Sequence, residues 1–301
     1  MIATLGLPMH LRFAARTCRA EVDVRSLRRE ELVVRATRYA NIVVDERILT
    51  RAFPIIAPPS RLQLVVLLEG RLSVGEPGAA FHVWPGEALL IVPEMTRVMR
   101  WVDARFVDVE WTAPDAAALT APRKLGRPDE AHVARIVRGL VEDGPDHRAR
   151  FADAVELVRS LGVDIPIDPV ALAGAPSDRD ARLARAIGEQ LANLADSAST
   201  LHFGEIAELS PRQLQRVVGE FAARYGMNAG NWRDMRNRWR VQLAAVLLSV
   251  PETSVGGVAK EVGYASTAAV ARAFANAGFR PPTEVRQALL AARDQASGGR
   301  E

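Results

Sequence analysis

The chain of 301 residues is long enough for two domains, and its composition, with 49% hydrophobic and 25% charged residues, is that of a soluble globular protein. We expect a cytoplasmic protein without membrane contact, because no apolar run reaches the roughly 20 residues that span a bilayer and no basic head precedes the N-terminal apolar stretch. The net charge of +3 does not by itself indicate a nucleic-acid-binding protein, and the single cysteine, Cys18, excludes an internal disulfide.

A β-rich segment covers residues 20–112. Short β-branched or aliphatic runs, bounded by charged or turn-forming residues, predict strands at 32–34, 42–44, 64–68 and 88–92. Turn-forming residues predict chain reversals at 69–71, 76–78 and 85–87. Short strands at about ten-residue spacing are typical of a barrel or a sandwich.

The hydrophobic period becomes helical between residues 128 and 163. One apolar stripe consists of Val133, Ile136, Val137 and Leu140, and a second consists of Phe151, Val155, Val158 and either Leu161 or Val163. The stretch EDGPDH at 142–147 predicts a loop between the two helices. A Pro-, Gly- and Ala-rich stretch at 163–178 predicts a linker.

Helical periodicity continues from residue 177. Ser177 or Asp178 can cap a helix that contains Leu183, Ile187, Leu191 and Leu194. A short helix with Ile206 and Leu209 as core candidates follows, and Ser210 then caps a helix that begins with Pro211. The buried stripe of that helix is predicted to be Leu214, Val217, Val218 and Phe221. Its opposite face carries Arg212, Gln215 and Arg216.

A single continuous helix is predicted over 231–250. Its about 20 residues give a length of about 30 Å, close to the roughly 34 Å between successive major-groove faces on one side of B-DNA. A rigid helix of this length can space two recognition helices by one turn of DNA. Arg233, Arg236 and Arg240 form a stripe that is either solvated or in contact with phosphates, while Trp232 and Trp239 fit packing roles.

A second compact helix pair is predicted over 258–282. Val258, Ala259 and Val262 form an apolar stripe, Gly263 ends the first helix, and Ser266 caps the second. Val270 and Phe274 point to a core, whereas the opposite face carries Thr267, Ala268, Ala271, Arg272 and Ala275. Gly278 and the two prolines at 281–282 end the helix. These residues alone also fit an ordinary αα-hairpin.

Both helix pairs resemble the helix-turn-helix motifs of the AraC/XylS family of bacterial transcription regulators. The second pair is similar to the family pattern in the order and spacing of Gly263-Tyr264, Ser266, Val270, Arg272, Phe274, Gly278 and Pro281. The run SPRQLQR at 210–216 is similar to the first motif of the family. The second pair departs from the family pattern at two positions: Ala268 stands where a polar residue is usual, and Val270 replaces an aromatic residue. In addition, the connection after Arg216 is a few residues longer than usual.

The resemblance implies a multi-domain α+β protein. Residues 1–126 would form a cupin-like β-barrel, 127–176 a helical connector, 177–294 an all-α DNA-binding domain with two helix-turn-helix motifs, and 295–301 a tail. The barrel would bind a small effector, or serve only dimer or protein contacts, and the connector helices would either form a dimer contact or cover the barrel. The implied partners are double-stranded promoter DNA, RNA polymerase and a second copy of the chain. Four polar residues of the barrel segment can face an effector: Arg38, Tyr39, Arg61 and Arg97.

The DNA-binding residues are predicted from side-chain chemistry on the two exposed helix faces. Arg212 and Arg216 can each donate two hydrogen bonds to guanine, and Gln215 can pair with adenine. Arg272 is the main candidate on the second helix, where Thr267 can meet a phosphate or a thymine methyl group. The complete predicted set is Ser210, Arg212, Gln213, Gln215, Arg216, Ser266, Thr267 and Arg272. We expect the first helix to supply most of the sequence discrimination and the second mainly to dock.

An enzyme is the rival interpretation of the β-rich segment. Catalytic cupins hold a metal with several histidines and a carboxylate, but the segment contains only His82, with His10 outside it. The chain also has no nucleophile elbow of the GxSxG type and no P-loop. We therefore expect no catalytic residue, no metal site and no cofactor, and the interpretation as a degenerate cupin enzyme fused to DNA-binding helices is disfavoured.

Overall fold

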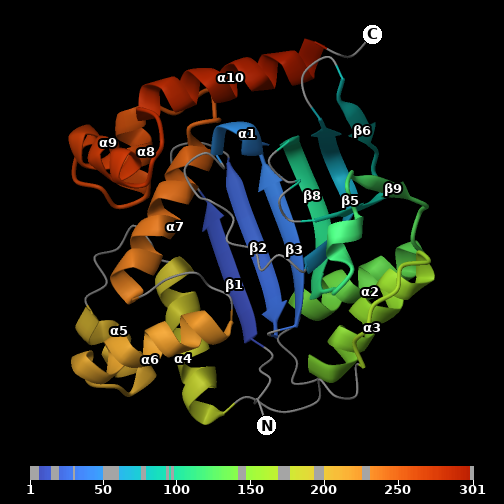
Figure 1. Ribbon diagram of the computed structural model, residues 1–301. Coiled ribbons are helices and arrows are strands. Elements are labelled where there is room, and N and C mark those ends of the chain that lie inside the picture. Colours follow the sequence, from blue (N-terminus) through green and yellow to red (C-terminus); the bar gives the residue numbers. More distant parts are fainter. Residues whose placement is uncertain are drawn as a thin grey trace.

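An antiparallel sheet of nine strands lies at the centre of the protein (Figure 1). The computed structural model describes residues 7–14, 20–29, 31–49, 61–75, 79–92, 95, 98–141, 147–168, 177–192, 200–225 and 231–298. The strands are β1 (Leu7–Ala14), β2 (Glu21–Arg28), β3 (Leu32–Ala40), β4 (Val43–Asp45), β5 (Arg61–Val74), β6 (Phe81–Val83), β7 (Ala88–Ile91), β8 (Met99–Thr112) and β9 (Arg123–Leu125). The strands predicted from the sequence fall on β3, β4, β5 and β7.

The sheet is open over the described residues, so the predicted closed barrel is wrong for this part of the chain. The pairing order is β1-β2-β3-β8-β5-β7-β9, with β4 also paired to β8 and β6 to β5. A barrel needs its two edge strands to pair with each other. Here the edge strand β1 pairs with β2 on one side and contacts helix α4 (Asp178–Ala192) instead of a further strand.

Residues with positive φ lie at neighbouring positions of β5, of β8 and of the connection between β3 and β4. Asn41 (φ 55°) separates β3 from β4, Asp103 (φ 47°) lies in β8, and Gly70 (φ 81°) lies in β5. A Cβ on Gly70 would lie 2.2 Å from the carbonyl oxygen of Asp103, so only glycine fits there. The turn predicted at 69–71 is therefore wrong: the ladder between β5 and β8 shifts register at this point and then continues.

The two faces of the sheet belong to different apolar cores. Leu64 and Val66 share one core with helices α2 (Glu130–Val141) and α3 (His147–Ser160), which cover that face. Val65 and Leu67 point to the other face, whose core continues into the helices of the C-terminal half. This alternation has the period of two residues that a β-strand imposes. Of the two roles considered for the connector helices, covering the sheet is the one observed, whereas a dimer contact stays a prediction.

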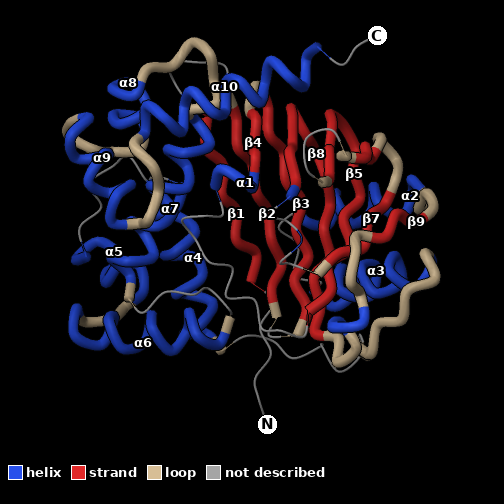
Figure 2. Tube along the Cα trace, turned by 45° about the horizontal axis from the view of Figure 1, so that its top comes forward, coloured by secondary structure: helices blue, strands red, loops and turns tan. Residues whose placement is uncertain are grey.

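The C-terminal half consists of helices beside the β1 edge and across one end of the strands (Figure 2). They are α4, α5 (Thr200–Ala207), α6 (Pro211–Arg224), α7 (Trp232–Leu247), α8 (Val255–Glu261), α9 (Thr267–Asn276) and α10 (Pro282–Gly298). Helix α10 continues past the predicted boundary at 294, so residues 295–298 are helical. The domain boundaries stay predictions. None of the helices described is long and apolar enough to cross a membrane.

Charged side chains line part of the inner face of the sheet, the face opposite α2 and α3. Arg35 pairs with Asp108 at 2.6 Å and with Glu110 at 2.8 Å, and Arg61 pairs with Glu110 at 2.8 Å. Burial alone raises the pKa of Glu110, but the charges of Arg35 and Arg61 lower it to about 2. Of the proposed effector contacts, Arg61 is thus engaged in an ion pair, and Arg97 lies outside the described residues.

Glu46, in the short helix α1 (Glu46–Leu49), gives a pH-dependent prediction. Burial, with a smaller contribution from the charge of Asp45, raises the pKa of Glu46 to about 7, above its unfolded value of 4.5. Its ionisation therefore destabilises the fold increasingly as pH rises from 4.5 to 7. We expect Glu46→Gln to stabilise the protein by on the order of 1 kcal/mol at about pH 8, with the gain disappearing toward pH 4.5. Thermal unfolding across this pH range measures the effect.

Glu110→Gln is the matched control, because the pKa of Glu110 moves in the opposite direction. The ionised form of Glu110 stabilises the fold above its unfolded pKa, so its removal lowers the melting temperature at about pH 8. Stabilisation by Glu46→Gln that is equal at all pH values would contradict the assignment to ionisation.

Candidate nucleic-acid interface

The first helix pair, α5 and α6, is joined by a turn that depends on one close backbone approach. The amide of Leu209 donates to the carbonyl of Gly204 at 2.9 Å, and Glu208 between the helices has φ 54°. A Cβ on Gly204 would lie 2.7 Å from the carbonyl oxygen of Leu209. The turn therefore needs glycine at 204 and holds a non-glycine residue in the left-handed region at 208.

Ser210 and Gln213 form a capping box at the start of α6. The Ser210 amide and hydroxyl donate to Gln213 Oε1 at 3.1 and 2.8 Å, and the Gln213 amide donates to Ser210 Oγ at 3.4 Å. Both residues belong to the predicted DNA-binding set. In the structure they are hydrogen-bonded to each other and fix the first turn of the helix.

The remaining surface of α6 separates a buried side from an exposed side, as predicted. Leu214, Val217, Val218 and Phe221 are buried in the core. Arg212, Gln215 and Arg216 are exposed together on the other side, and we call these three residues the α6 reading face. Arg216 lies 3.8 Å from Glu220, but both side chains are at least half exposed, so this pair holds the guanidinium only weakly.

The second helix pair, α8 and α9, repeats the same turn. The amide of Tyr264 donates to the carbonyl of Ala259 at 2.7 Å, and Gly263 has φ 78°. Ser266 caps α9 by accepting from the amide of Ala269 at 3.2 Å. Val270 and Phe274 are buried as predicted. Thr267, Ala268, Ala271, Arg272 and Ala275 are exposed and form the α9 reading face.

The connecting helix α7 is shorter than predicted and uses its arginines differently. It has 16 residues instead of about 20, which corresponds to about 24 Å. Arg240 donates from Nε to the carbonyl of Val262 at 2.6 Å and from Nη2 to the carbonyl of Gly263, and its guanidinium lies 4.7 Å from the ring centre of Tyr264. Arg240 thus holds the turn of the second pair, so the predicted stripe of solvated or phosphate-binding arginines is wrong at this position.

Aromatic packing joins the first pair to α7. The ring of Phe203 in α5 stacks on Trp232 at 4.6 Å between ring centres, and both side chains are buried. The sequence pattern indicated a packing role for Trp232 but missed Phe203, whose partner lies outside its own helix. As a result, α7 contacts both helix pairs, which lie along the same side of the molecule in Figures 1 and 2.

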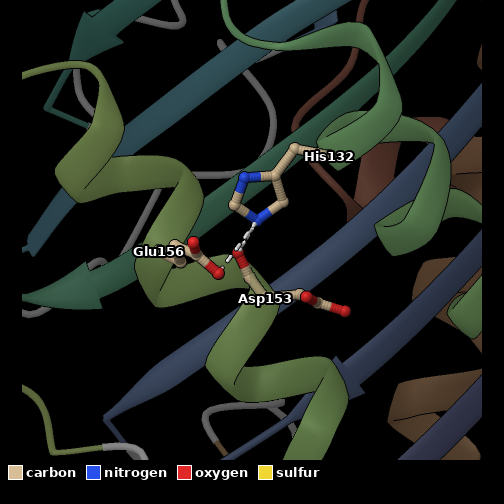
Figure 3. A group of neighbouring side chains, drawn as sticks. All are labelled: His132, Asp153 and Glu156. Atoms are coloured by element: carbon tan, nitrogen blue, oxygen red, sulfur yellow. Dashed lines mark hydrogen bonds and ion pairs between the residues drawn. The ribbon is translucent and has the colours of Figure 1, made fainter.

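One group of side chains with metal-binding potential lies away from these helices (Figure 3). Ligand atoms of His132 in α2 and of Asp153 and Glu156 in α3 lie within 4.8 Å of one another. His132 Nε2 donates to the backbone carbonyl of Asp153 at 2.7 Å, and Figure 3 shows the Asp153 carboxylate pointing away from the imidazole. The buried histidine therefore joins α2 to α3, a role that the sequence pattern did not reveal.

A curated transcription regulator is similar to part of the chain. The chain is 38% identical over 104 residues to the HTH-type transcriptional regulator RipA of Corynebacterium glutamicum. The match supports the resemblance of this chain to HTH-type transcriptional regulators. It spans 34% of this chain and 29% of the length of RipA. No protein-family model matches the chain.

Solved structures of transcription regulators are also similar to this chain. A DNA-binding transcriptional dual regulator from Escherichia coli K-12 is 21% identical, with 37% of this chain and 98% of the other covered and a TM-score of 0.29. ToxT from Vibrio cholerae is 8% identical, with 85% and 98% covered and a TM-score of 0.32. The AraC-like transcriptional activator CuxR is 13% identical, with 81% and 86% covered and a TM-score of 0.30.

The close approach at Gly204 gives a stability prediction. We expect Gly204→Ala to cost about 1–3 kcal/mol of unfolding free energy, because the new Cβ must displace backbone instead of a flexible side chain. Gly188→Ala in α4 is the matched control: a Cβ there meets no atom within 4 Å, so we expect a gain of about 0.5–1 kcal/mol from helix propensity. Urea denaturation of both variants measures the difference. Equal effects in the two variants would contradict the proposed steric constraint.

Proposed function

We propose that the protein is a transcription regulator that binds double-stranded promoter DNA in a sequence-specific manner. The observation that carries this proposal is the α6 reading face, where two arginines and a glutamine stand exposed on a helix whose opposite side is buried. Helices of this kind can enter the major groove and place guanidinium and amide groups against base edges. The α9 reading face provides a second helix that can contact DNA, and α7 connects it to the first.

We assign different roles to the two reading helices. Arg212 and Arg216 can each recognise guanine by two hydrogen bonds, and Gln215 can recognise adenine. On α9, Arg272 is the one exposed cation among small residues, so this helix can lie close to the bases but has fewer groups with which to distinguish them. The caps at Ser210 and Ser266 position the first turns, whose amides can face phosphates. Thus α6 provides most of the discrimination, and α9 mainly docks.

We propose that the sheet provides regulation, through a small effector that favours one arrangement of the two readers. The inner face of the sheet supports this, since it combines the ion pairs of Arg35 and Arg61 with the apolar rings of Trp101 and Phe106, whose centres lie 4.1 Å apart. The alternative is that the sheet serves only dimer or protein contacts. A second copy of the chain and RNA polymerase are the protein partners proposed for a cytoplasmic regulator without enzymatic activity.

Footprinting upstream of neighbouring genes is the direct test of DNA binding. A site of about two helical turns should be protected at moderate salt, with an affinity that falls as salt rises. Failure to protect any such site would contradict the proposal. For the effector, thermal-shift screening of the full chain should find a stabilising small molecule, whereas a sheet that serves only protein contacts should give none.

The division of labour between the helices predicts different effects of two arginine substitutions. We expect Arg216→Ala to weaken binding to the preferred site by about tenfold or more and to broaden base preference, and Arg272→Ala to weaken all sequences to a similar extent. Arg138→Ala is the charge-matched control, because Arg138 is exposed on α2, on the far face of the sheet. Binding titrations against a set of single-base variants measure this. A broader loss of preference in Arg272→Ala would reverse the assignment.

A further inference from the structure

The second helix pair is fixed to the sheet by a buried polar junction at β4. Ser249, between α7 and α8, accepts a hydrogen bond from the Val43 amide at 2.9 Å, with both residues buried. Arg293 of α10 donates to the carbonyl of Ser249 at 3.2 Å, to Asn41 Oδ1 at 3.1 Å and to the Asn41 carbonyl at 2.9 Å. The guanidinium of Arg293 therefore joins the helical half to the sheet, because it donates hydrogen bonds to acceptors in both.

Apolar and charged contacts surround this junction. Val43 and Val102 of the sheet pack against Ala292 and Ala296 of α10. Arg100 donates to the carbonyl of Ala292 at 3.4 Å while its Nε pairs with the buried Asp45 at 2.9 Å. Because buried hydrogen bonds of this kind leave costly unsatisfied groups when one partner is removed, the contact restrains the two parts strongly.

The position of the junction in the chain allows it to restrain the second helix pair. Ser249 precedes α8, and Arg293 lies in the helix that follows α9. The hydrogen bonds of the junction therefore hold the chain both before and after the second helix pair. The first pair is tied elsewhere, where Arg28 donates to the carbonyl of Tyr225 at 3.5 Å and α4 lies along β1. The sheet thus holds each pair through a separate contact.

We propose that Arg293 is a positioning residue for DNA binding, which fixes the second helix pair at the orientation that lets both reading faces engage one site. This proposal rests on the proposed function. Both reading faces are exposed in the docked arrangement, so the junction acts on orientation and not by covering the DNA-binding surface. Fixing two readers before binding reduces the entropy lost on forming the complex. Release of the junction therefore weakens only those complexes that use both readers.

Arg293→Gln tests the proposal on a duplex selected from random sequence by the wild-type protein. We expect this variant to lose about tenfold in affinity for the complete site, and to match the wild type on a shortened duplex that retains only the half bound by α6. Arg286→Gln is the matched control on the same helix, because Arg286 donates to Thr253 and Pro251 within the helical half and does not reach the sheet. The control should show the same ratio of full-site to half-site affinity as the wild type.

A second variant keeps the test decisive if Arg293→Gln fails to fold. Asn41→Gly removes the side-chain acceptor while suiting the φ of 55° at this position, and it should lower the full-site affinity in the same direction but less. Unchanged full-site affinity in the folded variants, or an equal loss on both duplexes, overturns the positioning role. A wild-type protein that selects no sequence would instead overturn the proposed function itself.

Discussion

The close approach of β5 and β8 at Gly70 and Asp103 is the constraint on which the rest of the structure depends. Gly70 and Asp103 meet so closely that a side chain at 70 has no room, and Asp103 exchanges hydrogen bonds of 3.0 Å with the backbone of Ile42. Asp103 is thereby bonded to the residue that directly precedes β4, and β4 is one of the strands that contact Ser249 and α10. This local backbone arrangement supports a strand on which the helical half docks.

The helical half uses the same local device twice. Each pair has a left-handed residue after its first helix, a hydrogen bond that closes the turn, and a serine that caps its second helix. Such devices set the angle within a pair but not between pairs. The angle between the pairs depends on α7, on the hydrogen bond from Arg240 to the turn of the second pair, and on the contacts of both pairs with the sheet.

Most of the helices and their buried sides could be predicted from the sequence, because helical periodicity and capping act over a few residues. The stripes at Leu214–Phe221 and at Val270–Phe274 are buried as expected, and the exposed residues opposite them form the two reading faces. The sheet was harder to predict. The sequence 69–71 has the residues of a turn, yet Gly70 serves a bulge, because glycine permits positive φ in either setting.

The sequence by itself determined which side chains face outward on α6 and α9 and where each of these helices begins, since these features depend on neighbours within about one turn. Only the tertiary structure decided that the described sheet stays open. It also decided that Arg240 and Arg293, which look like exposed helix arginines in the sequence, donate hydrogen bonds to distant residues. Arg240 binds a carbonyl 22 residues away, and Arg293 binds Asn41 across 252 residues. No local pattern can reveal such pairs, because an arginine exposed to solvent and one that bridges two parts of a fold occupy the same position in a helical repeat.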